Sequence, residues 1–404
     1  MSLGRKAIKQ LSSRLTGFSS RHASASSLSL NEHPFAHPEN VMSAWRVSSY
    51  GSLDKLSLCN DVSKPVISKP RDVLVKVRAA SLNPLDAAML GGYGQVLLDA
   101  MRSVEGCVQD RKISLPLTLG RDFCGEVVAK GCDVRNVRVG DTVYGVVVPH
   151  LPGSHADFVI TDSCLVSRKP EHLSDEEASS IFYTALTAWS ALKVTGDIIL
   201  TSPKGLRALV IGGSGGVGTV AIQLLKNWGV EVTTTCATDA VPLLESLNAD
   251  IVIDYKKPDA LKDLEIVGKF DIILDASGTA SPNMYLGFLR EWRNAKFITL
   301  KSPMLSNTDK FGLVGGMAQN ALDLALANIK SGAVAKGATV RWGFFLPVAA
   351  GISEINDMVS EKKIKPVVEK VYSFADMPAA FERMSGGHLR GKLVVTMDSS
   401  KVTN

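Results

Sequence analysis

Apolar residues in the second half of the chain gather in short runs of strand length, separated by segments with helical spacing. The runs are Leu206–Ile211, Val230–Thr235, Ile251–Ile253, Phe270–Leu274 and Lys296–Leu300. Between the first two runs, apolar residues recur on one helix face, at Val217, Ala221, Leu224, Leu225 and Trp228. Strands that alternate with helices in this way predict an α/β fold with a doubly wound parallel sheet.

The stretch from Trp45 to about Tyr183 has a different pattern. Short β-branched runs, among them Val73–Val77, Gly125–Val128 and Thr142–Val148, lie between Gly, Pro and Asp turn signals and predict an irregular domain dominated by strands. After about Phe345 we expect one more helix, Ile352–Glu361, and a strand-like tail, Lys392–Met397. We expect this tail to rejoin the first domain.

An insertion from Gly94 to Ile113 follows the turn-like segment Gly91–Gly94. It carries Val96, Leu97, Ala100 and Met101 at helical spacing. It is either a surface helix beside a ligand cleft or an insertion without a role.

The charge of the chain is unevenly placed. Residues 1–31 hold five basic residues and no acid, are rich in Ser, and alternate basic with apolar positions. This composition is typical of a mitochondrial transit peptide, which we predict for residues 1–40. A disordered tail without a targeting role is the alternative.

The rest of the chain is neutral, because 45 basic residues less these five leave 40 against 40 acidic ones. A broad nucleic-acid-binding surface would need a basic excess, so we expect none. No run approaches the ~18 apolar residues that cross a bilayer, so we do not expect an integral membrane protein. The six cysteines form no CxxC pair, and we expect them to be reduced and mostly buried.

The strongest local signal is Gly213-Ser214-Gly215-Gly216-Val217-Gly218, which matches GxGxxG directly after a predicted strand and before a predicted helix. The three glycines of the motif allow a tight turn, close approach of the backbone to a pyrophosphate, and close packing of helix on strand. The sequence therefore predicts a dinucleotide-binding loop.

The end of the second strand bears on the choice of nucleotide. It reads Thr235-Cys236-Ala237-Thr238, without the carboxylate that usually binds the ribose of NADH, although Asp239 follows and could still reach it. Tyr255, Lys256 and Lys257 offer a hydroxyl group and positive charge suited to a 2′-phosphate. NADPH is therefore favoured over NADH.

Several segments together resemble the quinone oxidoreductase branch of the medium-chain dehydrogenase/reductase superfamily. They are Ala80–Asp86, Gly120–Val127, Gly140–Gly145, the glycine loop and Gly387–Lys392. Arg341–Phe345, Phe297–Leu300 and the insertion after Tyr93 are similar to the group of mitochondrial reticulon-4-interacting proteins. The resemblance implies a GroES-like catalytic domain, residues 41–185 and 346–404, and a Rossmann NADPH-binding domain, residues 186–345.

The resemblance also implies that no metal is bound. Zinc-dependent relatives place a Cys near the position of Asn83, and a His-Glu pair where this chain has Arg121 and Asp122. The four-cysteine structural lobe of the alcohol dehydrogenases is missing as well. A tetrahedral zinc site cannot be assembled from these residues.

Individual roles in the cofactor site follow from the same resemblance. Ser214, Gly216 and Val217 would bind the pyrophosphate, and Ala237, Thr238 and Tyr255 would surround the adenosine ribose phosphate. Ala276, Leu300, Gly343 and Phe345 would line the nicotinamide half, and His388, Leu389 and Arg390 would close over the cofactor. Ala237 stands where a hydroxyl residue is usual, and Ala276 where an amide is usual.

The activity implied is zinc-independent hydride transfer from NADPH to a quinone-type acceptor, linked to ubiquinone biosynthesis in the mitochondrial matrix. The protein would hold the nicotinamide against the acceptor and exclude water. Asn83 could donate a hydrogen bond to the acceptor, and Tyr93 could do so or deliver a proton. Each of the two is also a common structural residue of turns.

Two other functions stay open. One is an enoyl-thioester reductase, since that zinc-free group shares the fold and commonly uses a tyrosine near this position. The other is an adaptor that binds NADPH and acts through a protein partner such as a reticulon. A homodimer is a further expectation from the resemblance.

Overall fold

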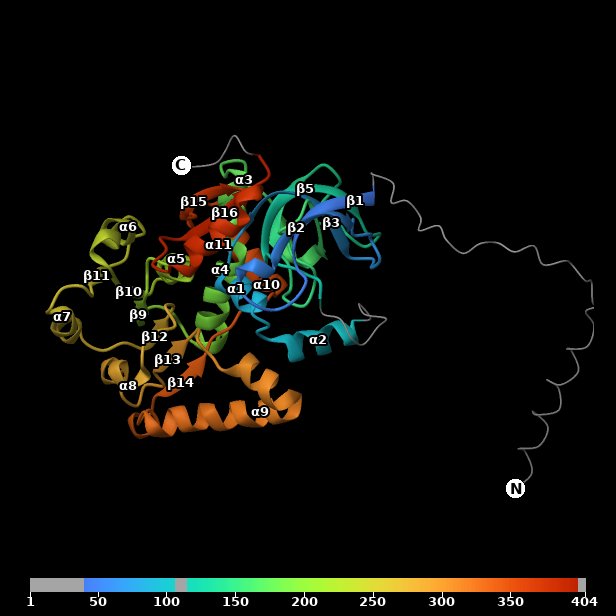
Figure 1. Cartoon of the computed structure of the whole chain (residues 1–404). Coiled ribbons are helices and arrows are strands. Elements are labelled where there is room, and N and C mark those ends of the chain that lie inside the picture. Colours follow the sequence, from blue (N-terminus) through green and yellow to red (C-terminus); the bar gives the residue numbers. More distant parts are fainter. Residues whose placement is uncertain (1–39, 106–114, 399–404) are drawn as a thin grey trace, which may run out of the picture. The chain divides into compact units, whose positions relative to one another are not determined.

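Six parallel strands form the sheet that carries the predicted nucleotide-binding loop (Figure 1). The structure, a computed structural model, describes residues 40–105 and 115–398. In sheet order the strands are β11 (Ile251–Asp254), β10 (Glu231–Cys236), β9 (Arg207–Ile211), β12 (Ile272–Asp275), β13 (Lys296–Thr299) and β14 (Thr339–Trp342). The order reverses between β9 and β12, which opens a crevice at their carboxyl ends. The α/β prediction with a doubly wound parallel sheet is confirmed.

Alternate side chains of these strands pack into separate cores on the two faces of the sheet. Ala208 and Val210 of β9 join one core, and Leu209 and Ile211 join the other. The first core includes α4 (Phe182–Trp189), α5 (Gly216–Asn227), α6 (Val241–Ser246) and α10 (Ala349–Ser360). The second includes α7 (Ala260–Val267) and α8 (Pro282–Tyr285). Helices therefore cover both faces, as the near-continuous apolar strands require.

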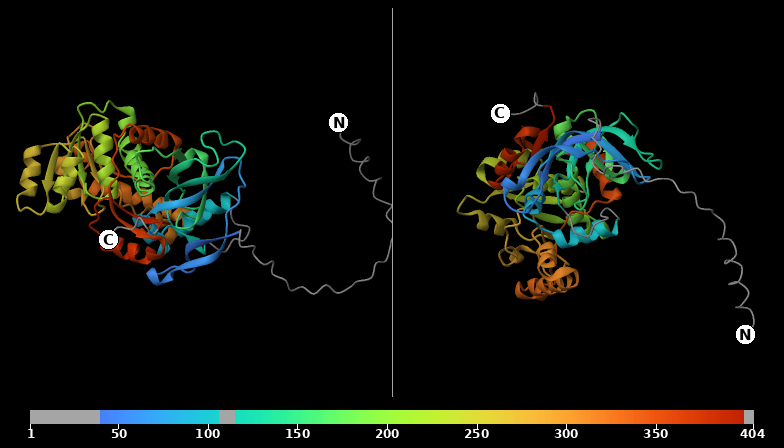
Figure 2. Two further views of the ribbon diagram at one scale, coloured as in Figure 1. Left: turned by 90° about the horizontal axis from the view of Figure 1, so that it is seen from above. Right: turned by 45° about the vertical axis from the view of Figure 1, so that its right-hand side comes forward.

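The remaining strands form two sheets, which Figure 2 shows to one side of the parallel sheet. A seven-stranded sheet runs β15-β16-β3-β5-β6-β8, with β7 paired to β3, and a three-stranded sheet runs β2-β1-β4. Their bounds are β1 Val41–Val47, β2 Leu56–Ser63, β3 Asp72–Ser81, β4 Leu117–Thr118, β5 Asp122–Lys130, β6 Thr142–Val146, β7 Phe158–Asp162, β8 Val166–Arg168, β15 Val368–Ser373 and β16 Lys392–Thr396.

Strand β16 pairs antiparallel with β3, so the C-terminal tail lies in one sheet with the N-terminal strands. The domain boundaries at 41–185, 186–345 and 346–404 stay predictions. The predicted transit peptide, residues 1–40, lies outside the described residues except for Asn40.

Shorter helices are α1 (Pro84–Leu90), α2 (Gln95–Val104), α3 (Asp175–Ser179) and α11 (Met377–Ser385). Helix α2 is the helix predicted in the insertion after Tyr93, and residues 106–114 of that insertion lie outside the described residues. Its first turn is anchored, because the backbone N–H groups of Gly94 and Val96 donate to the Asp309 carboxylate at 2.7 and 3.0 Å.

Helix α9 (Met304–Lys330) was not predicted from the sequence. It bends at Gly312, whose φ is 71°, and it lies at the outside of the molecule (Figure 1). Only four of its residues are buried, Asn307, Thr308, Gly316 and Asn320. Large apolar side chains are exposed along it, namely Phe311, Leu313, Val314, Met317, Leu322 and Ile329. The usual amphipathic pattern is therefore missing.

The side-chain amide of Asn328, on α9, covers the outer edge of β14. It donates to the Val340 carbonyl at 2.9 Å and accepts from the Val340 N–H at 2.8 Å. These are the backbone groups that a further strand would use, so α9 protects this edge of the parallel sheet.

The burial of the cysteines differs from what the sequence analysis predicts. All five in the described residues are free, but only Cys124 and Cys236 are buried, and Cys132 is exposed. The prediction that they are mostly buried is wrong, because Cys132 falls in the turn after β5 and the half-buried Cys59 in β2, the terminal strand of its sheet.

The carboxylate of Glu354 joins three helical segments beside the parallel sheet. It accepts hydrogen bonds from Trp189 Nε1 at 2.8 Å, from Trp228 Nε1 at 2.9 Å and from Lys193 Nζ at 2.7 and 2.5 Å. These donors come from α4, from the end of α5 and from the segment after α4. Glu354 therefore fixes α10 against all three segments.

We expect Glu354→Ala to lower the free energy of unfolding by about 2 kcal/mol, because two indole N–H groups and an ammonium group lose their acceptor. Urea unfolding followed by circular dichroism measures this loss. Glu361→Ala removes an exposed carboxylate that pairs with the exposed Lys363, and it should change the midpoint little. Equal effects of the two substitutions would contradict the role of Glu354.

Candidate active site

The predicted loop Gly213–Gly218 connects β9 to α5 at the point where the strand order reverses. A Cβ at Gly213 would lie 2.0 Å from Thr234 Oγ1, and one at Gly218 would lie 2.3 Å from the Gly212 carbonyl oxygen. Both glycines are therefore required by packing. A Cβ at Gly215 would meet nothing closer than 3.7 Å, and its φ of −77° suits any residue.

The protein's own packing thus leaves open space at Gly215, at the amino end of a 12-residue helix whose first N–H groups lack intrahelical acceptors. Open space beside such donors suits a phosphate group. The loop fits a dinucleotide pyrophosphate by its shape and by the chemistry of its donors.

The residues predicted around the adenosine ribose come together at the carboxyl ends of β10 and β11. Ala237 is buried directly after β10, Thr238 is exposed next to it, and the Tyr255 N–H donates to the Cys236 carbonyl at 3.0 Å. Tyr255 is 45% exposed, so the residue is open to a ligand at the surface.

The segment His388–Arg390 reaches the glycine loop from the C-terminal sheet. The Gly391 N–H donates to the Ser214 carbonyl at 2.8 Å, and Arg390 Nη1 lies 3.3 Å from Ser214 Oγ. His388 has a left-handed φ of 53° between two glycines of positive φ, which turns the segment tightly. The structure therefore brings this segment and the loop together, and the closing of His388, Leu389 and Arg390 over a cofactor stays a prediction.

The residues predicted to line the nicotinamide half also lie side by side. Ala276, Leu300 and Gly343 each follow directly after a strand and continue its ladder, with their N–H groups 3.0, 3.2 and 2.9 Å from carbonyl oxygens of the neighbouring strand. Phe345 stacks on Tyr183, with ring centroids 4.4 Å apart. The four residues thus mark the carboxyl edge of β12, β13 and β14.

Tyr93 lines a cavity of about 640 Å³. The other lining residues are Leu300, Lys301, Ser302, Pro303 and Ser306, from the segment between β13 and the first turns of α9. Burial, and to a lesser extent the charge of Asp309, raises the pKa of the Tyr93 phenol. Leu300, which the sequence analysis predicts at the nicotinamide half of the site, thus also borders this cavity.

Asn83 has a different environment from Tyr93. It is fully buried, its Nδ2 donates to Asp122 Oδ2 at 3.2 Å, and its Oδ1 accepts from the Lys392 ammonium. The hydrogen bonds of its amide are therefore directed into the protein rather than toward the cavity.

Asp122 is the centre of a buried polar cluster beneath the site. Its carboxylate accepts from Ser81 Oγ at 2.6 Å and from the Tyr183 N–H at 2.6 Å, and Lys392 Nζ lies 3.5 Å away. Burial raises the pKa of Asp122 and lowers the pKa of Lys392, and each shift is opposed by the charge of the other residue. The pair fixes the start of α4 against β3, β5 and β16.

A second buried pair lies beside the first. Asp86 and Arg121 are both fully buried, with Asp86 Oδ1 3.7 Å from Arg121 Nε. The Gly120 N–H donates to Asp86 at 2.8 Å, and the Arg121 guanidinium donates to the carbonyl groups of Thr118, Val148 and Leu151. The cluster holds two acidic and two basic side chains and is balanced in charge.

Among residues 40–105 and 115–398, no group of three or more His, Cys, Asp or Glu side chains is placed to hold a metal ion. In the same part of the chain, no helix combines the length and the apolar character needed to span a bilayer.

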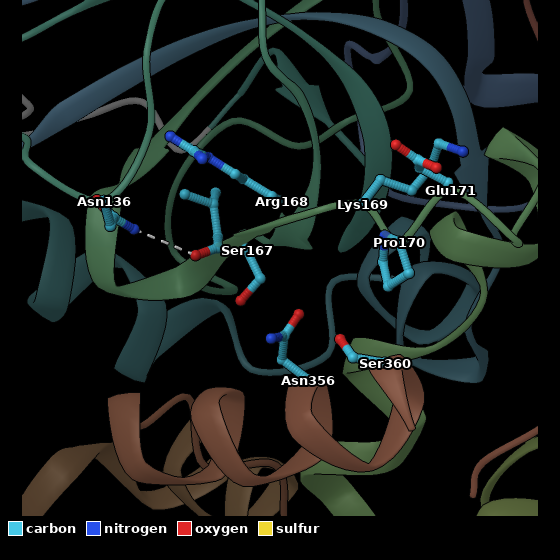
Figure 3. Close-up of a pocket in the computed structure, with 9 residues that line it drawn as sticks. Asn136, Ser167, Arg168, Lys169, Pro170, Glu171, Asn356 and Ser360 are labelled. Carbon is cyan, nitrogen blue, oxygen red and sulfur yellow. Dashed lines mark hydrogen bonds between the residues drawn. The ribbon is translucent and has the colours of Figure 1, made fainter. Parts of the chain in front are cut away.

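A polar pocket of about 440 Å³ lies elsewhere, between β8 and α10 (Figure 3). Arg168 and Lys169 line it, but both are paired, with Asp141 at 2.9 Å and with Asp175 at 3.7 Å. No residue that the sequence analysis assigns to the site lines this pocket.

The sequence analysis missed Tyr183, the partner of Asp122 and Phe345, and it gave no role to Lys392. The signals for the two differ. Lys392 directly precedes the apolar residues Leu393, Val394 and Val395 in a strand, and a lysine in such a run is a marker of a buried ion pair. Tyr183 sits among apolar residues at the start of a helix and carries no comparable signal.

Two family models match the chain. Residues 69–170 match the alcohol dehydrogenase GroES-like domain, and residues 247–395 match the zinc-binding dehydrogenase family. The mitochondrial NAD(P)H oxidoreductase RTN4IP1 of Danio rerio is 43% identical over 88% of this chain and 92% of its own length. A 2-methylene-furan-3-one reductase of Solanum lycopersicum is 30% identical over 88% of this chain and 79% of its own.

Among solved structures, the quinone oxidoreductase from Coxiella burnetii superposes with a TM-score of 0.69 at 26% identity. The match covers 89% of this chain and all of that one.

Gly213 and Gly215 provide a matched test of the loop. We expect Gly215→Ala to leave the thermal midpoint nearly unchanged but to weaken NADPH binding at least tenfold, because a methyl group would stand where the phosphate approaches the backbone. Gly213→Ala should lower the free energy of unfolding by about 2 kcal/mol through its clash with Thr234. Unchanged NADPH binding by Gly215→Ala would exclude this loop as the phosphate site.

Proposed function

The chain belongs to the medium-chain dehydrogenase/reductase superfamily, in the group of mitochondrial NAD(P)H oxidoreductases named RTN4IP1, and we propose that it reduces a quinone-type acceptor with NADPH and without a catalytic zinc ion. The observation that carries this proposal is the cavity lined by both Tyr93 and Leu300, since Leu300 is predicted to line the nicotinamide half of the site.

The bound cofactor would supply the hydride. The residues of this chain would position the cofactor and the acceptor, shield them from water and protonate the reduced acceptor. Gly215 and the first turn of α5 hold the pyrophosphate, and the Tyr183–Phe345 stack forms a wall beside the ring. Tyr93 donates a proton to the reduced acceptor, for which its raised pKa keeps it protonated at neutral pH. Asn83 acts as a positioning residue through its bonds to Asp122 and Lys392.

The choice of NADPH over NADH is supported by side chains near the second and third strands. Tyr255 is accessible, Lys256 and Lys257 are exposed, and Arg390 lies beside Ser214. Hydroxyl, ammonium and guanidinium groups are the usual ligands of a 2′-phosphate.

The absence of a catalytic zinc is supported by the identity and bonding of the residues at the matching positions. Asn83 is an amide, Arg121 is a cation, and the Asp122 carboxylate is occupied by donors from Ser81, Asn83 and Tyr183. None of the three offers a free anionic or imidazole ligand.

A second candidate reaction is reduction of a carbon–carbon double bond conjugated to a carbonyl group, as in an enoyl thioester. The similarity to a 2-methylene-furan-3-one reductase favours it, and the same tyrosine would protonate the product.

Location and partners follow from the relatives. We propose that the protein acts in the mitochondrial matrix in ubiquinone biosynthesis, supported by the mitochondrial names of its relatives and by the transit-like residues 1–40.

A homodimer is supported by the exposed apolar side chains of α9, and sedimentation analysis of the purified protein tests it. An adaptor role with a reticulon-type partner is supported only by the name of a Caenorhabditis elegans relative, a reticulon-4-interacting protein.

The acceptor is tested by comparing NADPH oxidation with a short-chain ubiquinone analogue and with crotonyl thioester, both in buffer containing a metal chelator. We expect turnover with the quinone and little with the thioester. Turnover with the thioester alone would show that the protein is an enoyl reductase. Tight NADPH binding without turnover of either acceptor would favour the adaptor role.

Tyr93→Phe should reduce turnover at least tenfold while leaving the NADPH dissociation constant within about twofold, because only the proton donor is lost. Since the donor must be protonated and its pKa is raised, the wild-type rate should stay level from about pH 6 to pH 9. Tyr285→Phe, at another half-buried tyrosine, is the control. A wild-type rate that falls already near pH 7 would exclude Tyr93 as the donor.

A further inference from the structure

Asp239 lies three residues beyond the end of β10, in the short 3-10 helix Thr238–Ala240. Although its side chain is 68% exposed, it binds Arg390 with both oxygens. Arg390 Nε donates to Oδ2 at 3.0 Å, and Nη2 donates to Oδ1 and Oδ2 at 2.9 and 2.8 Å. This is the forked geometry of a strong arginine–carboxylate pair.

Arg390 is held by the rest of the chain as well. Its Nη1 donates to the His388 carbonyl at 3.0 Å and lies 3.3 Å from Ser214 Oγ, and its backbone N–H donates to Glu369 at 2.5 Å. The guanidinium therefore lies between the glycine loop and the end of the second strand.

In a doubly wound nucleotide-binding sheet, this is where the adenosine ribose is received. The two nucleotides differ only at this ribose, whose 2′ and 3′ hydroxyls are both free in NADH and whose 2′ position carries a phosphate in NADPH. A carboxylate suits the hydroxyls as an acceptor, whereas a guanidinium suits the phosphate. Arg390 already binds Asp239 through its forked edge, Nε and Nη2, so a phosphate that uses this edge must displace the carboxylate.

We propose that Asp239 is a specificity-determining residue, which competes with the 2′-phosphate of NADPH for the guanidinium group of Arg390. This inference rests on the proposed function, since it requires a nucleotide in the glycine loop. This competition keeps the affinity for NADPH only slightly above the affinity for NADH. The reason is that Arg390 must break its ion pair with Asp239 before it can bind the 2′-phosphate.

The surrounding charges are consistent with this competition. The hydrogen bond from Arg390 is the main cause that lowers the pKa of Asp239, and the charges of Arg390 and His388 add to it, so the carboxylate is ionised at neutral pH. Lys256, whose ammonium lies 5.5 Å from the centroid of the Tyr255 ring, and the exposed Lys257 stand after the third strand. They attract a phosphate without competing for Arg390.

The test is the equilibrium binding of NADPH and NADH to the Asp239→Asn protein, followed by nicotinamide fluorescence. We expect NADPH to bind about fivefold to tenfold more tightly than to the wild type, because a repelling charge and a competing ligand are removed. NADH should bind equally or slightly more weakly, since Asn still offers an acceptor to the ribose.

Two variants control this result. Glu245→Gln removes the same unit of charge from an exposed residue of α6 without touching Arg390, and it should change either affinity by less than about twofold at physiological salt. In an Arg390→Met background, Asp239→Asn should lose most of its effect on NADPH, because the two substitutions act through one interaction.

Weaker NADPH binding by Asp239→Asn would overturn the proposal, since Asp239 would then orient Arg390 for the phosphate. An equal change for both nucleotides, or no change, would overturn it as well. If the wild-type protein bound neither nucleotide, the proposed function itself would fail, which separates the two claims.

Discussion

Four elements meet at the carboxylate of Asp122, which is fully buried at the start of β5. It binds the Ser81 hydroxyl at the end of β3, the amide of Asn83, the backbone of Tyr183 near the start of α4, and the ammonium of Lys392 on β16. A buried carboxylate is tolerated only when its charge and its hydrogen-bonding capacity are both matched. The partners of Asp122 lie on strands that are distant in sequence and on α4, the helix that leads toward the parallel sheet. These elements must therefore keep fixed positions for the charge and the hydrogen bonds of Asp122 to be matched.

The position of the site follows from this constraint. Tyr183 binds Asp122 through its backbone and stacks on Phe345 through its ring, so the buried cluster is connected to the carboxyl edge of the parallel sheet. Lys392 directly follows Gly391, whose N–H binds the glycine loop. The group of Asp122, Lys392, Asp86 and Arg121 is balanced in charge, and it holds these elements together beside the predicted site.

Much of the fold could be predicted because its signals are local. Five of the six strands of the parallel sheet lie in runs of strand length that the sequence shows, whereas β14 does not, and the loop Gly213–Gly218 carries its motif within six residues. Helix α9 could not be predicted by periodicity, since Phe311, Val314 and Met317 are exposed rather than packed and Gly312 interrupts the helix. The pair of Asp239 and Arg390 joins residues 151 positions apart, and no local pattern reveals it. Asn83 was predicted as a site residue from the resemblance, but only the fold shows that its amide is bound by Asp122 and Lys392.

The most direct test of a zinc-free reductase is a single turnover under anaerobic conditions, with chelator-treated protein, a ubiquinone analogue and NADPH deuterated at the transferred position of C4. The account predicts oxidation of the nucleotide without added metal, slowed about twofold or more by the deuterium, because hydride leaves C4 in the step observed. Oxidation that appears only after zinc is restored would contradict it, as would binding of the nucleotide without any oxidation.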